Sequence, residues 1–293
     1  MRRLAITAAL LTSAFCASAQ RRGVVEISVA NMREEPDYTA EMGTQALMGT
    51  EVEIVGSESY WLQVITPDGY KAWTNAMSIK EMDENQLSDW KNAGKLICMA
   101  DHGTVFSQPS LNSQPVSDLV RGDRLVRLGK KRKGFLHVST PGGKTGWVKS
   151  KDLLDEGAWS EKSVCSGDAV VREALRQVGV PYLWGGASPK GFDCSGLTSF
   201  SAFMNGRILP RNASQQAKLG AEVKLDELQK GDLLFFGNTE TGRVTHVGIY
   251  IGDGHIVHAS QLVRINSIVA GESDVYENMQ KFLFARRIFT LDQ

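Results

Sequence analysis

The chain has 293 residues, with 33 basic and 33 acidic side chains, 42% hydrophobic residues and 23% charged residues. This length leaves room for two or three domains, and the hydrophobic fraction is sufficient for packed cores, which excludes a wholly disordered chain. A formal net charge of zero also lacks the basic excess that is typical of nucleic-acid-binding proteins. We therefore expect no nucleic-acid partner.

The first residues have the pattern of a secretory signal. Arg2 and Arg3 precede an apolar run that ends at Phe15, and residues 17–19 (Ala-Ser-Ala) match a signal peptidase site. The run is shorter than the roughly 20 residues that span a bilayer, so a membrane anchor is the weaker interpretation. We expect residues 1–19 to be a signal peptide and the mature protein to be periplasmic or extracellular, without a membrane span.

The first half contains an internal repeat. Residues 61–69 align with residues 135–143, and Trp73 then aligns with Trp147. Each copy alternates apolar and polar residues around a Pro-Asp-Gly or Pro-Gly-Gly turn, which is typical of small β-barrels. The two copies resemble bacterial SH3-like domains, expected over residues 20–80 and 95–155, with a polar connector over residues 81–94.

Three cysteines remain once the signal segment is set aside: Cys98, Cys165 and Cys194. An odd number is unusual in an oxidising compartment. Either Cys98 pairs with Cys165 and leaves Cys194 free, or all three are reduced. We expect no metal site, because the sequence has no Cys-x-x-Cys or His-x-x-x-His spacing.

Cys194 has the setting of a nucleophile. The pattern becomes helical over residues 169–178, and after a turn-rich stretch a second apolar stripe at helical spacing follows Cys194. A cysteine at a helix N-terminus has its thiolate stabilised by the helix dipole, which predicts a thiol pKa below about 8.5. The alternative is a buried structural cysteine; the polar neighbours Asp193 and Ser195 favour the nucleophile.

The histidines of the second half lie close together in the sequence. Residues 244–251 and 256–259 read as two strands around the turn 252–254, so His246 and His258 are expected to be neighbours on paired strands. We expect His246 to act as base to the thiol and His258 to orient it. His255, beside the turn, is expected to be exposed.

Five segments in this order resemble the NlpC-type family of bacterial cell-wall cysteine peptidases: Tyr182-Leu183-Trp184-Gly185-Gly186, Phe192-Asp193-Cys194-Ser195-Gly196, the Gly231-Asp232 strand, His246-Val247-Gly248-Ile249-Tyr250 and His258-Ala259. The resemblance implies an α+β, papain-like domain over residues 165–293. It also implies hydrolysis of the bond between γ-D-glutamate and a diamino acid, meso-diaminopimelate or L-Lys, in peptidoglycan stem peptides. We also expect no cofactor, on this family resemblance.

The resemblance also implies roles for individual residues. It assigns the nucleophile to Cys194, the general base to His246, the third polar residue to His258 and an oxyanion-side tyrosine to Tyr182. Asp193 and Ser195 match positions that line the substrate pocket, and Arg211 and Ser214 match a substrate-side loop.

SH3-like domains before such a catalytic unit resemble a subgroup in which the first barrel closes one end of the groove. There, an acidic residue and a tyrosine of the barrel join Asp193 and Trp184 in binding the free amine of an N-terminal L-Ala. The candidates here are Glu34 or Glu35, and Tyr70. The second copy has Ser107 and Lys144 at those places, and its role is binding or structural packing.

This resemblance predicts that freed stem peptides, L-Ala-γ-D-Glu-diamino acid, are the partners and that the protein is a monomer. Two alternatives stay open. The catalytic unit could be an N-acetylmuramoyl-L-alanine amidase, or the protein could be a non-enzymatic wall-binding adaptor with a blocked Cys194. A lipid acyltransferase shares the cysteine–histidine logic but fits neither the export signal nor the SH3-like domains.

Overall fold

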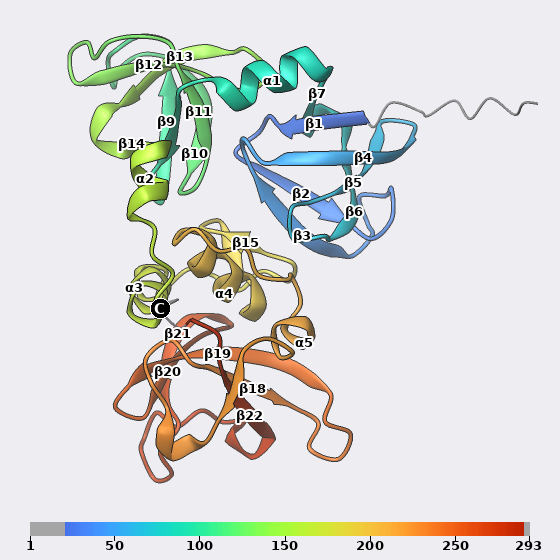
Figure 1. The fold of residues 1–293 in the computed structure, drawn as a ribbon, viewed down its shortest axis with the longest axis vertical. Coiled ribbons are helices and arrows are strands. Elements are labelled where there is room, and N and C mark those ends of the chain that lie inside the picture. Colours follow the sequence, from blue (N-terminus) through green and yellow to red (C-terminus); the bar gives the residue numbers. More distant parts are fainter. Residues whose placement is uncertain (1–20, 290–293) are drawn as a thin grey trace, which may run out of the picture.

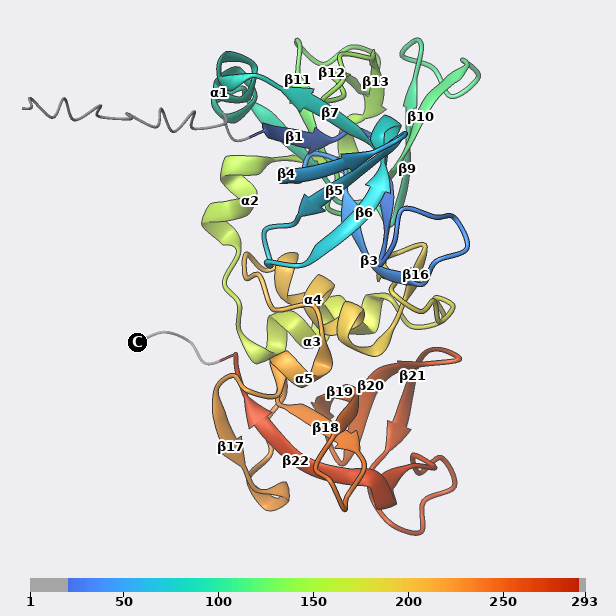
Figure 2. The same ribbon diagram turned by 90° about the vertical axis from the view of Figure 1, so that its right-hand side faces the viewer.

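The computed structural model describes residues 21–289, so the predicted signal segment, residues 1–19, lies outside the described residues. Two β-sheets from the first half occupy one end of the molecule, and the helices and the sheet formed by residues 167–289 occupy the other (Figures 1 and 2). None of the helices between residues 21 and 289 has the length and apolar character needed to cross a membrane.

The first sheet has seven antiparallel strands in the order β3-β2-β6-β5-β4-β1-β7. Its strands are β1 (Arg21–Val25), β2 (Val29–Arg33), β3 (Met42–Leu47), β4 (Glu51–Glu58), β5 (Trp61–Ile65), β6 (Lys71–Asn75) and β7 (Ile79–Met82). The predicted alternation holds, because Val52 and Ile54 on β4 and Leu62 and Val64 on β5 are all buried in one core. Gly69, at a φ of 80°, makes the turn that joins β5 to β6.

The second sheet repeats this arrangement strand for strand, in the order β10-β9-β13-β12-β11-β8-β14. Its strands are β8 (Lys95–Cys98), β9 (His102–Phe106), β10 (Pro115–Val120), β11 (Arg124–Arg127), β12 (Phe135–Ser139), β13 (Thr145–Lys149) and β14 (Leu153–Asp155). Within residues 21–289 the strand pairing of each sheet runs from one edge to the other without closing into a ring. Closure into a barrel therefore stays a prediction.

The segment expected to be a polar connector contains a helix, α1 (Glu84–Asn92). Asp83 caps it by accepting a hydrogen bond from the Gln86 N–H, and the Gln86 side-chain oxygen accepts one from the Asp83 N–H. Leu87 and Trp90, one turn apart, are buried against Val24 of the first sheet. The sequence suggested this helix only weakly, because two apolar residues are a faint periodic signal.

The second half is α+β, as predicted. It contains α2 (Glu156–Lys162), α3 (Gly167–Arg176), β15 (Ala187–Ser188), β16 (Gly191–Phe192), α4 (Cys194–Phe203), α5 (Ala213–Gln216), β17 (Ala221–Val223), β18 (Leu233–Gly237), β19 (Val244–Gly252), β20 (His255–Ser260), β21 (Leu262–Ser267) and β22 (Phe282–Arg287). Six strands form an antiparallel sheet in the order β17-β22-β18-β19-β20-β21. Helices α3 and α4 pack on β19 and β20, between this sheet and the first half (Figure 2).

One hydrophobic core joins the two halves. Val29 and Leu47 of the first sheet and Ile97 and Val120 of the second belong to the same buried cluster as Leu197 on α4. The second sheet is also held to α3 by a buried ion pair, in which the Arg121 guanidinium contacts the Glu173 carboxylate at 2.7 and 2.9 Å. Both sheets are therefore packed onto the second half of the chain through a shared core.

Candidate active site

Cys194 is the first residue of α4, as the sequence predicted. Asp193 is the N-cap and accepts a hydrogen bond of 2.7 Å from the Gly196 N–H, which is the usual way an aspartate starts a helix. Gly196 allows the helix to approach the preceding loop, because a Cβ at this position would lie 1.9 Å from the Gly186 carbonyl oxygen. The thiol is buried, with Cys194 8% exposed.

The prediction of a lowered thiol pKa is wrong for this structure. Burial raises the pKa of Cys194 to about 11, and the negative charge of Asp193 adds to the rise. Backbone N–H groups of Val247 and Ser195 act in the opposite direction but do not compensate. Removal from water outweighs the helix dipole here, so the resting group is a thiol.

The two predicted histidine neighbours are in contact. His246 on β19 and His258 on β20 are brought together by the antiparallel pairing of these strands, and His246 Nε2 lies 2.8 Å from His258 Nδ1. Burial lowers the pKa of His246 to about 3, with further lowering by His258 and Arg264. Tyr276 packs against both imidazole rings, at centroid distances of 5.6 and 4.6 Å.

The thiol lies on the helix that packs on β19, the strand that carries His246. The Val247 N–H, which acts to lower the pKa of Cys194, belongs to the residue after His246. Tyr182 lies near the sulfur: burial raises the pKa of its phenol to about 12, and its proximity to Cys194 and Asp193 adds to this. The phenol therefore keeps its proton and is a hydrogen-bond donor near the sulfur.

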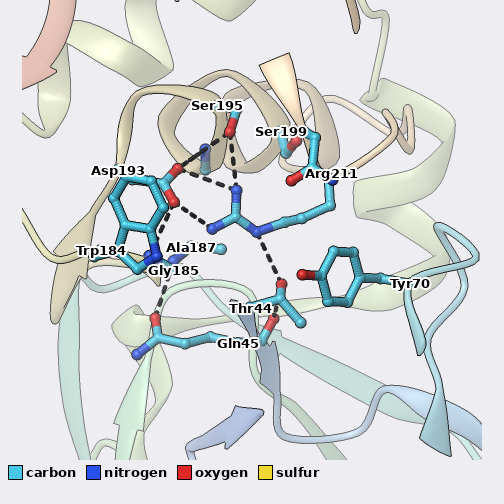
Figure 3. A network of polar contacts seen from close by, with 12 residues as sticks. Thr44, Gln45, Tyr70, Trp184, Gly185, Ala187, Asp193, Ser195, Ser199 and Arg211 are labelled. Atoms are coloured by element: carbon cyan, nitrogen blue, oxygen red, sulfur yellow. Dashed lines mark hydrogen bonds and ion pairs between the residues drawn. The ribbon is translucent and has the colours of Figure 1, made fainter. Parts of the chain in front are cut away.

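Asp193, Ser195 and Arg211 form one buried network (Figure 3). The Arg211 guanidinium donates to both Asp193 carboxylate oxygens, at 3.1 and 2.5 Å, and to the Ser195 hydroxyl at 2.9 Å. Its Nε donates to the Thr44 hydroxyl of the first sheet at 3.0 Å. Arg211 is only 3% exposed, so its donors serve the protein interior.

Ser214, the other predicted loop residue, lies elsewhere. It is exposed on α5 and lines a different hollow with Arg243 and Arg286. The structure therefore brings Arg211, and not Ser214, together with the cysteine loop.

The first sheet presents Glu34 and Tyr70 as a pair. The Tyr70 hydroxyl donates to the Glu34 carboxylate at 2.5 Å, and burial together with this carboxylate raises the pKa of Tyr70. Gly43 makes the contact sterically possible, because a Cβ there would lie 2.2 Å from the Glu34 Oε1 and 2.5 Å from the Tyr70 oxygen. Of the two predicted candidates, Glu34 and not Glu35 is therefore the acidic partner of Tyr70.

A second carboxylate of the first sheet also contacts the cysteine-side half of the chain, and no sequence pattern predicted it. We call the surface formed by Glu34, Glu41, Thr44, Gln45 and Tyr70 the wall of the first sheet. The indole N–H of Trp184 donates to Glu41 of the first sheet at 2.7 Å, across 143 positions of the chain. The neighbouring Gln45 accepts from the Ala187 N–H at 3.0 Å and from the Ser188 hydroxyl at 2.8 Å. No local sequence pattern marks Glu41 or Gln45, because their partners come from the other half of the chain.

Comparison with known proteins agrees with this geometry. Residues 179–286 match the NlpC/P60 family, and residues 28–80 and 101–154 each match the bacterial SH3 domain. A protein of Bacillus cereus named gamma-D-glutamyl-L-lysine dipeptidyl-peptidase is 30% identical over 83% of this chain and 74% of its own length. The chain belongs to the NlpC/P60 family.

Other NlpC/P60 relatives extend the comparison. Dipeptidyl-peptidase 6 of Lysinibacillus sphaericus is 30% identical over 84% of this chain and 91% of its own length. The crystal structure of an NlpC/P60 family protein from Bacillus cereus superposes with a TM-score of 0.78 over 92% of this chain and 100% of that one, at 23% identity. The whole arrangement of sheets and helices is therefore a fold already seen in this family.

Two further sequence expectations concern cysteine pairing and metal ligands. Cys98, Cys165 and Cys194 are all free thiols, so the pairing of Cys98 with Cys165 is not found. Among residues 21–289 one group could hold a metal ion: His255 Nε2 lies 3.8 Å from Glu272 and 4.0 Å from Asp274. These contacts leave His255 only partly exposed, in contrast to the prediction, and the group does not include the thiol.

Proposed function

We propose that this chain is a cysteine endopeptidase that hydrolyses the bond between γ-D-glutamate and the diamino acid in peptidoglycan stem peptides with a free N-terminal L-Ala. One observation carries the proposal: a cysteine at the start of α4 lies against β19 beside a histidine pair 2.8 Å apart. The names of the two dipeptidyl-peptidase relatives support the choice of bond. The chemistry needs no metal or organic cofactor.

The resting site is neutral, and this determines the first step. His246 is an unprotonated imidazole and Cys194 a thiol at neutral pH, so His246 takes the thiol proton as the sulfur attacks the γ-carbonyl carbon. The carbonyl oxygen becomes an oxyanion. The Cys194 N–H, unpaired within the helix because it opens α4, and the Tyr182 hydroxyl are its donors.

The second half of the cycle returns the proton. The His246 imidazolium protonates the leaving amine of the diamino acid as the C–N bond breaks, which leaves a thioester on Cys194. His246 then removes a proton from water as the water attacks the thioester carbon. The C–S bond breaks, L-Ala-D-Glu leaves, and the thiol recovers its proton.

The wall of the first sheet selects the substrate's amino terminus. Asp193, which we expected to bind the amine, is already paired with Arg211. We therefore assign the amine to the two carboxylates of the first sheet that contact aromatic side chains: Glu34, held by Tyr70, and Glu41, held by Trp184. A free L-Ala ammonium fits two carboxylates, whereas a lactyl amide of intact peptidoglycan would bring bulk and no charge.

The proposal also covers the fold type and the cellular location of the protein. A papain-like arrangement is supported by α4, which carries the cysteine and packs on an antiparallel sheet. The two SH3-like sheets are inferred to be barrels by their matches to the bacterial SH3 domain. Residues 1–19 have the pattern of an export signal, so we place the activity in the periplasm or outside the cell.

Defined peptides test the proposal directly. Wild type and Cys194→Ala are incubated with L-Ala-γ-D-Glu-meso-diaminopimelate and with the L-Lys peptide, each with a free or an acetylated amino terminus, and products are identified by mass spectrometry. We expect L-Ala-D-Glu from the free peptides with wild type alone. Equal turnover of the acetylated peptides would contradict selection by Glu34 and Glu41. Release of L-Ala peptides from muramoyl substrates would establish the amidase, and no cleavage at all the adaptor.

A further inference from the structure

A third side chain continues the histidine pair. Asn266 is on β21, and its Oδ1 lies 2.9 Å from His258 Nε2. On its other side the Asn266 Nδ2 donates to the Asp274 carbonyl oxygen at 2.8 Å. The order of groups is therefore the Asp274 carbonyl, Asn266, His258 and His246, which lies on β19, the strand against which the Cys194 helix packs.

The direction of every hydrogen bond in this row of groups follows from the Asp274 carbonyl at its far end. A backbone carbonyl oxygen only accepts, so the Asn266 group that faces Asp274 is the amide NH₂, and the group that faces His258 is the amide oxygen. An amide oxygen also only accepts, so His258 Nε2 carries a hydrogen. A neutral imidazole has one hydrogen, so His258 Nδ1 is bare and accepts from His246 Nε2. His246 Nδ1 is then bare as well.

We propose that Asn266 is a positioning residue that sets the tautomers of His258 and His246 and so leaves His246 Nδ1 free to accept the Cys194 proton. This rests on the proposed function, because the bare nitrogen matters only if His246 is a base. With the opposite tautomers, His246 Nδ1 would carry a hydrogen and could not take one from the thiol.

The surroundings of Asn266 hold the carbonyl that fixes the direction. The Asp274 carbonyl also accepts from the Ser267 N–H at 3.2 Å, and the Tyr276 N–H donates to the Ser267 carbonyl at 2.8 Å. The segment that carries the carbonyl is thus tied to β21 at Asp274 itself and two residues later, at Tyr276. His258 is completely buried, so water does not offer its Nε2 a competing partner.

Tautomers are measured directly by NMR of protein labelled with ¹⁵N-histidine. Long-range ¹H–¹⁵N spectra at about pH 8, above the ordinary histidine pKa, distinguish a protonated ring nitrogen from a bare one. The signals are assigned with His246→Gln and His258→Gln, and the three other histidines are internal controls. We expect hydrogen on Nε2 of both His246 and His258. Hydrogen on Nδ1 of either residue would overturn the proposal, whether or not wild type cleaves any peptide.

Two variants of Asn266 separate its acceptor from its bulk. Asn266→Asp keeps an oxygen that accepts from His258, so we expect kcat within about tenfold of wild type. Asn266→Leu keeps the size but has no acceptor, so we expect a mixture of tautomers by NMR and a kcat about 10- to 100-fold lower, since general-base catalysis is worth about 10²–10⁴-fold. Equal losses in the two variants, or wild-type tautomers in Asn266→Leu, would show that Asn266 only supports the fold.

Discussion

The first and second sheets share one strand order but contact the catalytic half in different ways. The first sheet contributes Glu34, Glu41, Thr44, Gln45 and Tyr70 to the wall beside the cysteine loop. The second sheet reaches α3 through Arg121 and has Ser107 and Lys144 at the places of Glu34 and Tyr70. The same fold thus packs beside the cysteine loop in one copy, where we propose that it faces substrate, and packs on α3 in the other, and the difference lies in a few side chains.

The largest expected effects on stability come from removing one buried arginine at the contact of each sheet with the second half of the chain. Arg211→Met leaves Asp193 buried without its partner, and Arg121→Met does the same to Glu173. Each should lower the free energy of unfolding by about 3–5 kcal/mol, measured by urea denaturation. Only Arg211→Met should also reduce kcat/KM per folded molecule, because Asp193 caps the helix that carries Cys194.

The milder variants Arg211→Lys and Arg121→Lys serve as controls where the methionine variants are too unstable to assay. Lysine keeps the charge but not the two parallel hydrogen bonds. An equal loss of activity per folded molecule on both sides would erase the proposed distinction between wall and support.

Substitution at the corresponding loop positions separates the sheets further. Tyr70→Phe removes the hydroxyl that holds Glu34, so we expect KM for the free-amine peptide to rise about tenfold, equivalent to one hydrogen bond of about 1.4 kcal/mol. Lys144→Met, at the corresponding place in the second sheet, removes only the contact of a largely exposed lysine with Glu26, at 3.5 Å, and should leave KM within about twofold. A similar rise in both variants would contradict a role specific to the first sheet.

The acid side of the pH–rate profile tests whether the protonation of His246 is independent of both sheets. Burial lowers the pKa of His246 to about 3, so the base gains its proton only well below the ordinary value of about 6.5. We expect kcat/KM to hold as pH falls through about 6.5 in wild type, Tyr70→Phe and Lys144→Met alike. A loss of activity centred near 6.5 would show that the histidine is not desolvated.

Alkylation of the thiol gives the matching result on the basic side. Because burial raises the pKa of Cys194 to about 11, its reaction with iodoacetamide should accelerate with pH beyond the ordinary thiol value of about 8.5. Cys194→Ala measures the background from Cys98 and Cys165. A rate that is already constant at neutral pH would indicate a preformed thiolate.

The smallest effect is expected at the exposed junction of the two sheets. Lys190 of the cysteine loop contacts Asp118 of the second sheet at 2.6 Å and the Ser28 hydroxyl of the first at 2.8 Å. Lys190→Met should lower the free energy of unfolding by less than about 1 kcal/mol, and added salt should reduce the difference. A loss as large as that of Arg121→Met would mean that this junction, and not α3, anchors the second sheet.

Sequence patterns predicted the parts of the site that depend on neighbours in the chain. The apolar stripe that follows Cys194 marked the start of α4, and the Gly-Asp-Gly turn placed His246 beside His258. Both features are local, since helical periodicity and a hairpin turn are each set by a few neighbouring residues. The resemblance also identified Tyr70, which lies in the same loop of the first repeat as the turn glycine.

The missed residues depend on tertiary packing. Glu41 reaches Trp184 across 143 positions, and Asn266 acts through a carbonyl on a loop that no periodicity marks. The thiol pKa was misjudged for the same reason, because the helix dipole is visible in the sequence while burial is not. Arg211 was correctly associated with the cysteine loop, but its burial under Thr44 required the fold.

The hydrophobic cluster that includes Leu47, Ile97 and Leu197 crosses all three units, and this bears on cooperativity. Units joined by a shared core cannot expose their facing surfaces one at a time without a large cost in apolar hydration. The described chain should therefore melt in a single calorimetric transition, in which the SH3-like sheets protect the catalytic half from partial opening. The two sheets would then also stabilise the peptidase half against local unfolding.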